Sequence, residues 1–341
     1  MPSAADEISA AIAAAGGAIP FSEYMQLALY GQGGFYTTGG RAGRRGGDFI
    51  TSPEVGPLFG TVIARALDAW WKEFGSPSRF DVVECGAGPG TLARSILAAQ
   101  PECANAMHYV AVEFSASQRA LHPLGVESRE TMPDGPITGV VLVNELLDNL
   151  PFRLFVFDGS WMEAFVAQAT AGQFVEVLRT PEVVPSCLPL HAPLGARAPI
   201  QDAAASWVRN SLSKIDHGRL LLFDYCSAST AEIALTPWRE WLRTYRDQDR
   251  GTHYLSDPGS QDITTQVMLD QLPSGFSAAT QVDFLQKWGI GELVREGSDY
   301  WENMKHAPDV AAMKMRSRIA EAKSLIDQTG LGAFTALSWQ K

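Results

Sequence analysis

Apolar and polar residues alternate in blocks from about residue 80 onward, and these blocks predict an α/β architecture. Short runs rich in Val, Leu and Phe recur between stretches with helical periodicity. Such runs are typical of strands buried on both faces, and their alternation with helices predicts a mostly parallel sheet joined by crossover helices. The predicted strands cover residues 80–86, 108–115, 139–145 and 218–226, and the predicted helices cover 90–100, 115–125 and 200–215.

The segments outside this alternation predict additions to the α/β fold. Residues 31–56 hold nine glycines together with charged and aromatic residues, and we interpret them as a functional loop, with a disordered connector as the alternative. Residues 152–166 predict a β-hairpin that turns at Asp158-Gly159. We therefore expect N-terminal helices and a Gly-rich loop in 1–75 and an α/β domain in 76–341, with insertions at about 152–200 and 236–275.

Composition narrows the function only slightly. The 341 residues carry a formal net charge of −11, which weighs against general nucleic-acid binding, since a phosphate backbone favours basic surfaces. No apolar run approaches the length of a membrane span. The four cysteines form no CxxC pair and are not spaced with histidines as zinc ligands are, so we expect no metal site. These cysteines, together with the lack of a convincing signal peptide, predict a reduced, cytoplasmic protein. Whether the protein forms a homodimer stays open.

A glycine-rich turn follows the first predicted strand of the α/β region. Glu84 precedes Gly86-Ala87-Gly88-Pro89-Gly90, and a helix follows. Glycines let the backbone turn tightly and let a ligand approach closely. The spacing is GxGxG, whereas a dinucleotide-binding fingerprint reads GxGxxG. A carboxylate at position 84 would repel a pyrophosphate but attract an ammonium or sulfonium group, so a dehydrogenase is the weakest interpretation.

Two further strands also end in acids or amides. Glu113 ends the second strand, where a carboxylate can accept both hydroxyls of a ribose. The third strand ends in Asn144-Glu145, and Asp148 follows. Because ligands of open α/β sheets bind outside the carboxyl ends of the strands, these residues are expected on one rim. The alternative is a plain α/β protein with unrelated acids at its loop starts.

This arrangement resembles a class I S-adenosylmethionine-dependent methyltransferase with a Rossmann-like, seven-stranded sheet. "GGDFITSPEVGPLFG", "VVECGAGPGTL", "NELLDNLP" and "PGSQDITTQV" occur in the same order as in the MidA-like family, which includes a mitochondrial complex I assembly factor that methylates protein arginine. The resemblance covers roughly residues 18–340. Where the family usually has paired aromatic residues after the Asn-Glu pair, this chain has Leu146-Leu147.

From the residues and the resemblance together, we assign expected roles. S-adenosylmethionine is the expected cofactor, and the residues expected to bind it are Glu84, Gly86, Gly88, Gly90, Glu113, Asn144, Thr51 and Pro53. Thr51 could instead only cap the helix that follows Pro53. The expected catalytic residues are Glu145, Asp148 and Asn144, with the two carboxylates holding a guanidinium; Asp148 could instead only cap a turn. The residues expected to bind the substrate are Asp224, Tyr225, Asp262 and Thr264; Asp224 and Tyr225 could instead only be a strand end whose polar groups are satisfied.

The acceptor stays open at this level. An arginine nitrogen of a protein is the acceptor that the resemblance implies. A methyltransferase for a small molecule is the first alternative. A cofactor-binding assembly or interaction protein without turnover is the second, and the intact acids at positions 84, 113, 145 and 148 weigh against it.

Overall fold

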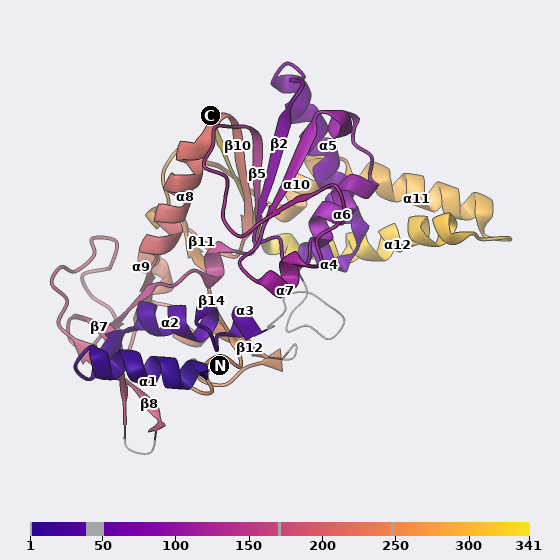
Figure 1. Cartoon of the computed structure of the whole chain (residues 1–341). Helices are drawn as coiled ribbons and strands as arrows, with labels where there is room; N and C mark the ends of the chain where they lie inside the picture. The colour runs from indigo at the N-terminus through magenta and orange to yellow at the C-terminus, as the bar shows by residue number, and fades with distance from the viewer. Residues whose placement is uncertain (1, 39–50, 170–171, 247–248) are drawn as a thin grey trace. The chain divides into compact units, whose positions relative to one another are not determined.

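The computed structural model of the protein (Figure 1) describes residues 2–38, 51–169, 172–246 and 249–341. The chain divides into two compact units assembled from interleaved segments. Unit 1 comprises Met1–Phe49, Leu146–Asn210 and Tyr225–Ser274, and unit 2 comprises Ile50–Glu145, Ser211–Asp224 and Gly275–Lys341. The sequence-based division after residue 75 stays a prediction.

Unit 2 is built on a seven-stranded sheet. Its strands, in spatial order, are β16 (Ser277–Thr280), β17 (Thr335–Gln340), β10 (Ile215–Asp224), β5 (Ile137–Asn144), β2 (Phe80–Cys85), β3 (Met107–Val112) and β4 (Glu127–Arg129). The five strands from β10 to β4 are parallel, whereas β17 and β16 pair antiparallel. The α/β class is thus confirmed, and the sheet is mixed.

The register of the parallel strands brings their carboxyl ends to one level. Cys85 at the end of β2 lies opposite Val112 of β3 and Val143 of β5. Asn144 at the end of β5 lies opposite Phe223 of β10. The residues that directly follow these strands therefore emerge along one edge of the sheet.

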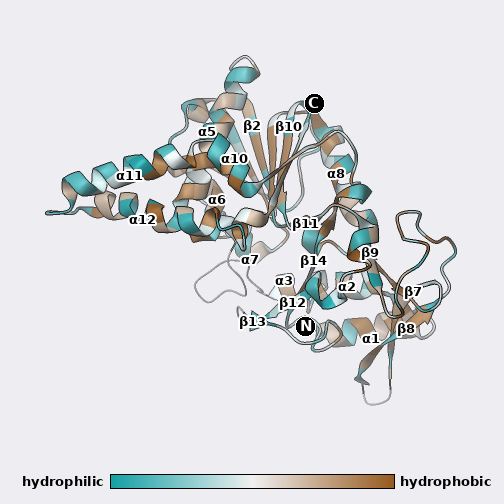
Figure 2. Cartoon of the chain, turned by 180° about the vertical axis from the view of Figure 1, so that it is seen from behind, coloured by the Kyte–Doolittle hydropathy of each residue, from teal (hydrophilic) through white to brown (hydrophobic). Residues whose placement is uncertain are grey.

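Helices α5 (Pro57–Glu73), α6 (Thr91–Ala98) and α10 (Gln281–Lys287) form one hydrophobic core with the sheet. Strands β2 and β10 are apolar along most of their length (Figure 2). Edge-to-face aromatic contacts join Phe223 to Phe59 and Phe284, with ring centroids 5.3 and 5.0 Å apart. The apolar strand runs in the sequence are thus explained by burial.

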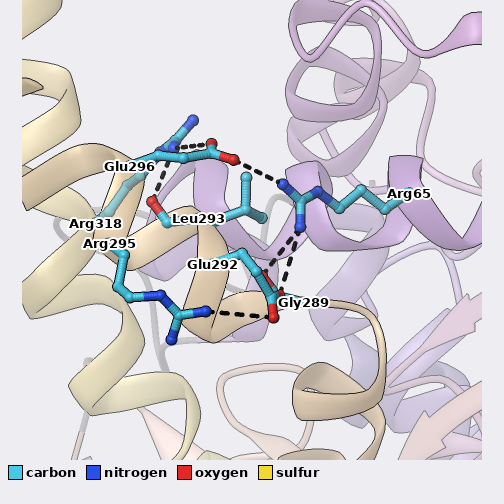
Figure 3. Close-up of polar contacts among 7 residues, drawn as sticks. All are labelled: Arg65, Gly289, Glu292, Leu293, Arg295, Glu296 and Arg318. Atoms are coloured by element: carbon cyan, nitrogen blue, oxygen red, sulfur yellow. Dashed lines mark hydrogen bonds and ion pairs between the residues drawn. The ribbon is translucent and has the colours of Figure 1, made fainter. Parts of the chain in front are cut away.

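Helices α11 (Ile290–Met304) and α12 (Val310–Leu325) form an antiparallel hairpin within unit 2 (Figures 1 and 2). A Cβ at Gly297 would lie 2.5 Å from the Met315 carbonyl oxygen, so only glycine permits this close helix approach. Arg65 of α5 fastens the hairpin: its Nη2 lies 3.1 Å from Glu296 Oε1, and Arg318 of α12 also contacts Glu296 (Figure 3).

The remaining elements of unit 2 are short. They are the helical turns α4 (Ser52–Val55) and α7 (Ala116–Arg119) and the 3-10 turns η1 (Glu102–Asn105) and η6 (Leu331–Ala333). The predicted helix over 115–125 is wrong beyond α7, because the chain turns before Pro123. Helix α8 (Asp202–Lys214) confirms the helix predicted over 200–215 and carries the chain from unit 1 into unit 2.

Unit 1 has a five-stranded antiparallel sheet. β6 (Arg153–Phe157) and β7 (Trp161–Gln168) form the predicted hairpin, and Gly159 turns between them with φ +78°. β1 (Ala18–Pro20), β8 (Phe174–Arg179) and β9 (Arg197–Ile200) complete the sheet. Helices α1 (Ala4–Ala14) and α2 (Phe21–Tyr30) share a hydrophobic core with it.

Smaller elements complete unit 1. Its other helices and turns are α3 (Phe35–Thr38), α9 (Thr230–Ile233), η2 (Leu147–Asn149), η4 (Trp238–Glu240) and η5 (Leu269–Gln271). Its other strands are β11 (Cys226–Ser227), β12 (Leu242–Arg246), β13 (Asp249–Arg250), β14 (Asp262–Thr265) and β15 (Val267–Met268). Across the described ranges, no helix of either unit combines the length and apolarity that a membrane crossing requires.

Two facing glycines set the approach of β5 and β10, and their replacement tests the register. A Cβ at Gly218 would lie 1.9 Å from the Gly139 carbonyl oxygen. Gly218→Ala should therefore lower the free energy of unfolding by about 3 kcal/mol, because the added methyl group would force the backbones of β5 and β10 apart. Gly291→Ala is the matched control: its nearest neighbour, Arg295 Nη1, is 3.7 Å away, and helix propensity favours alanine. Urea denaturation measures both, and equal stability of the two variants would contradict the register.

Candidate active site

The glycine turn lies in unit 2, where β2 passes into α6. Gly86, Gly88 and Gly90 have φ values of +71°, +51° and +79°, which favour glycine. The Gly86 and Ala87 N–H groups donate to the Val112 carbonyl oxygen at 3.0 and 3.1 Å, which ties the turn to β3. A Cβ at Gly88 would meet no atom within 4 Å, so the backbone is open to a ligand there.

Glu113, which directly follows β3, fastens this turn. Its Oε2 accepts a hydrogen bond from the Gly88 N–H at 2.9 Å, and its Oε1 accepts one from the Ser115 N–H at 2.8 Å. The structure thus brings Glu113 and the predicted glycines together. A carboxylate has about four acceptor positions, so these two bonds leave capacity for the hydroxyls of a ribose.

Glu84 is buried beside the turn. Its Oε2 accepts a hydrogen bond from the Tyr109 hydroxyl at 2.7 Å. Burial raises the pKa of the Glu84 carboxyl to about 7, and the nearby charge of Glu113 adds to the increase, whereas the Tyr109 hydrogen bond opposes it. A cation bound beside Glu84 would favour its ionised form.

Asn144 is the last residue of β5 and Glu145 directly follows it, at the edge of the sheet that also carries the glycine turn. The Asn144 Nδ2 donates to Glu145 Oε1 at 2.9 Å. The Asn144 Oδ1 is buried and accepts no hydrogen bond from the residues that the structure describes. The backbone of Glu145 has a φ of +52°, which is rare for residues other than Gly, Asn or Asp. The Glu145 N–H donates to the Phe223 carbonyl oxygen at 2.9 Å.

The "TSPE" segment supports the glycine turn from α4. Thr51 and Pro53 are buried, and the side chain of Thr51 makes no capping hydrogen bond. The Thr91 hydroxyl, at the start of α6, donates to Glu54 Oε1 at 2.6 Å. Glu54 is thus a supporting residue missing from the sequence-based site. The arginines at 41, 44 and 45 and Asp48 of the Gly-rich loop lie outside the described residues.

A second group of predicted residues lies in unit 1. Asp148, in η2, accepts a hydrogen bond from the Thr264 hydroxyl at 2.6 Å. Asp262 accepts hydrogen bonds from Asn149 Nδ2 and the Tyr36 hydroxyl, each at 3.0 Å. The structure thus brings Asp148 together with Asp262 and Thr264, which follow it by 114 and 116 positions in the sequence. Burial raises the pKa of Tyr36, and the charge of Asp262 adds to the increase, so the hydroxyl stays a donor.

Asp224 and Tyr225 fall on the two sides of the division between the units. Asp224, at the end of β10 in unit 2, is fully buried. The Tyr225 carbonyl oxygen, in unit 1, accepts a hydrogen bond from the Val267 N–H at 2.7 Å. Their substrate-binding role stays a prediction.

A family model described as "Putative S-adenosyl-L-methionine-dependent methyltransferase" matches residues 62–286. The chain belongs to this methyltransferase family. S-adenosylmethionine is therefore its methyl donor, and the expected MidA-like resemblance is confirmed. The rim of the methyltransferase fits this donor: the turn at Gly88 is open, and the buried Asn144 Oδ1 can accept from an ammonium group.

Solved structures and curated proteins agree with this placement. A crystal structure from Burkholderia thailandensis, bound to S-adenosyl-homocysteine, is 26% identical with a TM-score of 0.84, and the match covers 99% of this methyltransferase and 92% of that chain. The "Protein arginine methyltransferase NDUFAF7 homolog, mitochondrial" of Drosophila melanogaster is 33% identical over 189 residues, 46% of this chain and 43% of the relative. The human NDUFAF7 protein is 38% identical over 82 residues, 24% of this chain and 18% of the relative. The matches thus span less than half of these curated relatives.

The expected cytoplasmic location is contradicted, because the curated relatives of this methyltransferase are mitochondrial proteins. No group of three His, Cys, Asp or Glu side chains suited to a metal ion occurs within the described ranges.

The pKa of Glu84 predicts a pH dependence of stability. In the folded protein its pKa is about 7, above its ordinary value of 4.5. The protonated carboxyl therefore contributes its full stability below about pH 4.5, and this contribution is lost as the pH rises through about 7. Glu84→Gln, measured without ligand, should therefore gain stability relative to wild type between pH 5 and 8, by roughly 2 to 3 kcal/mol. A pH-independent difference in urea denaturation would contradict the assigned pKa.

Glu113 is the residue whose loss should weaken donor binding most. Glu113→Gln keeps the size but removes the charge that accepts hydrogen bonds from the Gly88 and Ser115 N–H groups and that is expected to accept the hydroxyls of the donor's ribose. We expect the affinity for S-adenosylmethionine to fall at least about tenfold. Isothermal titration measures it, with Glu127→Gln, an exposed carboxylate of β4, as the control that should bind normally.

Proposed function

We propose that the protein transfers a methyl group from S-adenosylmethionine to an arginine guanidinium nitrogen of a protein substrate. The observation that carries the proposal is the placement of Glu145. Its carboxylate is held by Asn144, and its backbone adopts an uncommon conformation at the same sheet edge as the glycine turn. Strained backbone of this kind costs about 1 kcal/mol or more and is frequent at active sites.

A carboxylate is the group that a guanidinium acceptor requires. The guanidinium is planar and cationic, and its N–H groups pair with carboxylates in a fork geometry. Glu145 would draw the positive charge toward one nitrogen, which leaves more electron density on the nitrogen that attacks the methyl group. The bound donor supplies an electrophilic methyl group with a neutral thioether as leaving group; the attacking nitrogen releases one proton, which a carboxylate can accept.

The other predicted residues keep their roles as proposals. Asp148 is proposed as a catalytic residue, and its bond to Thr264 holds it in a defined position within unit 1. The proposed substrate-binding residues are Asp224, Tyr225, Asp262 and Thr264. The acceptor class is supported by the curated relatives, which are protein arginine methyltransferases at 33 to 39% identity.

Glu145→Gln should separate binding from transfer. The variant keeps the size of the side chain but loses the negative charge, so S-adenosylmethionine should bind within about twofold of wild type while methyl transfer falls at least about 100-fold. Asp216→Asn, an exposed carboxylate at the opposite end of β10, is the matched control and should retain full activity. If Glu145→Gln loses binding and transfer in equal measure, Glu145 belongs to the donor site instead.

The acceptor class is tested by labelled methyl transfer into a lysate of cells that lack the protein. After acid hydrolysis of the protein fraction, the label should appear as methylarginine with wild type and be absent with Glu145→Gln. Label confined to small molecules, or to another amino acid, would contradict the arginine proposal but would leave the methyltransferase assignment intact.

A further inference from the structure

We propose that unit 1 carries a binding site for an acidic, extended peptide segment, formed by an arginine-lined hollow and the cavity that adjoins it. This inference rests on the proposed function, in which the methyl acceptor is a protein. It states which kind of peptide segment of that protein unit 1 would bind. All residues that carry it belong to unit 1.

The hollow has a volume of about 270 Å³, and its lining includes Arg239, Arg243 and Arg250; among the residues that the structure describes, it includes no Asp or Glu. Of the carboxylates that the structure describes, none forms an ion pair with these three arginines. Other arginines of unit 1 do have carboxylate partners: Arg197 binds Glu176 at 2.8 Å, and Arg246 lies 3.9 Å from Asp257. Three guanidinium groups with no ion-pair partner among the described carboxylates, in a protein of net charge −11, therefore indicate a local site for anions.

Two of the three guanidinium groups are held in place before any ligand binds. The Arg239 guanidinium lies over the Trp238 ring, 4.4 Å from its centroid. The Arg243 Nε donates to the Glu240 carbonyl oxygen at 2.7 Å, which leaves its terminal nitrogens as donors. Side chains fixed in this way lose less conformational entropy when they bind an anion.

The shape favours an extended segment over a compact anion. A second cavity of about 990 Å³ shares His253 and Tyr254 with the arginine hollow, so the two adjoin. Its lining includes Phe174, Val175 and Glu176 of β8, and Val175 is 37% exposed. Within the described ranges, β8 pairs with β7 alone. A strand edge of this kind can accept an added strand through backbone hydrogen bonds, while pockets select its side chains.

Carboxylates of the bound peptide segment would thus pair with the guanidinium groups of Arg239, Arg243 and Arg250. The apolar residues of the segment would enter the larger cavity. A sequence that alternates acidic and apolar residues presents both kinds of side chain along one extended strand. Inorganic phosphate would satisfy the arginines but not the adjoining cavity.

The test uses the full-length protein without S-adenosylmethionine. A fluorescein-labelled octapeptide of alternating Glu and Val is titrated with wild type and with R239Q/R243Q/R250Q, and binding is followed by fluorescence anisotropy. We expect the Kd to rise at least about tenfold in the variant. The matched control R209Q/K314Q/K323Q removes three exposed positive charges elsewhere and should bind within about twofold of wild type.

Three outcomes would overturn the inference: no binding by wild type, equal binding by the hollow variant and wild type, or equal binding of an octapeptide with Gln in place of Glu. Displacement of the peptide by inorganic tripolyphosphate at a lower concentration than by unlabelled peptide would also overturn it in favour of a phosphate site. If circular dichroism shows that the triple variant is unfolded, the single variant Arg250→Gln is titrated instead. Its affinity for the peptide should be about threefold lower than that of wild type. Because no methyl transfer is measured, failure of the arginine methylation proposal gives a separate result.

Discussion

The candidate donor site depends on one constraint, which is the register that brings the carboxyl ends of β3, β2, β5 and β10 to the same level. A shift of one residue between β2 and β5 would displace Asn144 and Glu145 from the edge that carries the glycine turn. The register is fixed by burial of both sheet faces and by the close approach of Gly139 and Gly218. The apolar strands therefore serve the chemistry indirectly, because they determine where polar residues emerge.

Hydrogen bonds then hold the emerging residues in place. Glu113 fastens the turn through the Gly88 N–H, and Asn144 holds Glu145. Glu84 differs from them, because burial makes its charge unfavourable until a cation is present. A rim with one weakly acidic carboxylate and an open backbone suits a donor that carries an ammonium and a sulfonium group, and this agrees with the family of the chain.

The sequence predicts where the strands end and where the glycine turn lies, because both are local signals. It does not predict the partners that arrive from distant segments. Tyr109 on β3 and Glu54 in α4 contact the rim through side chains whose direction no periodicity reveals. Helix α11 is missed, because Gly291 and Gly297 interrupt its pattern, and Gly297 is explained only by the neighbouring α12. The interleaving of the units is likewise set by long-range packing.

A crystal structure of the protein with S-adenosyl-homocysteine is the most direct test. The ribose hydroxyls should lie at the Glu113 carboxylate, the amino-acid part along Gly86 to Gly90, and the ammonium group near Glu84 or the Asn144 Oδ1. A ligand bound away from the carboxyl ends of β2 and β3, or a ribose that makes no contact with Glu113, would contradict this placement.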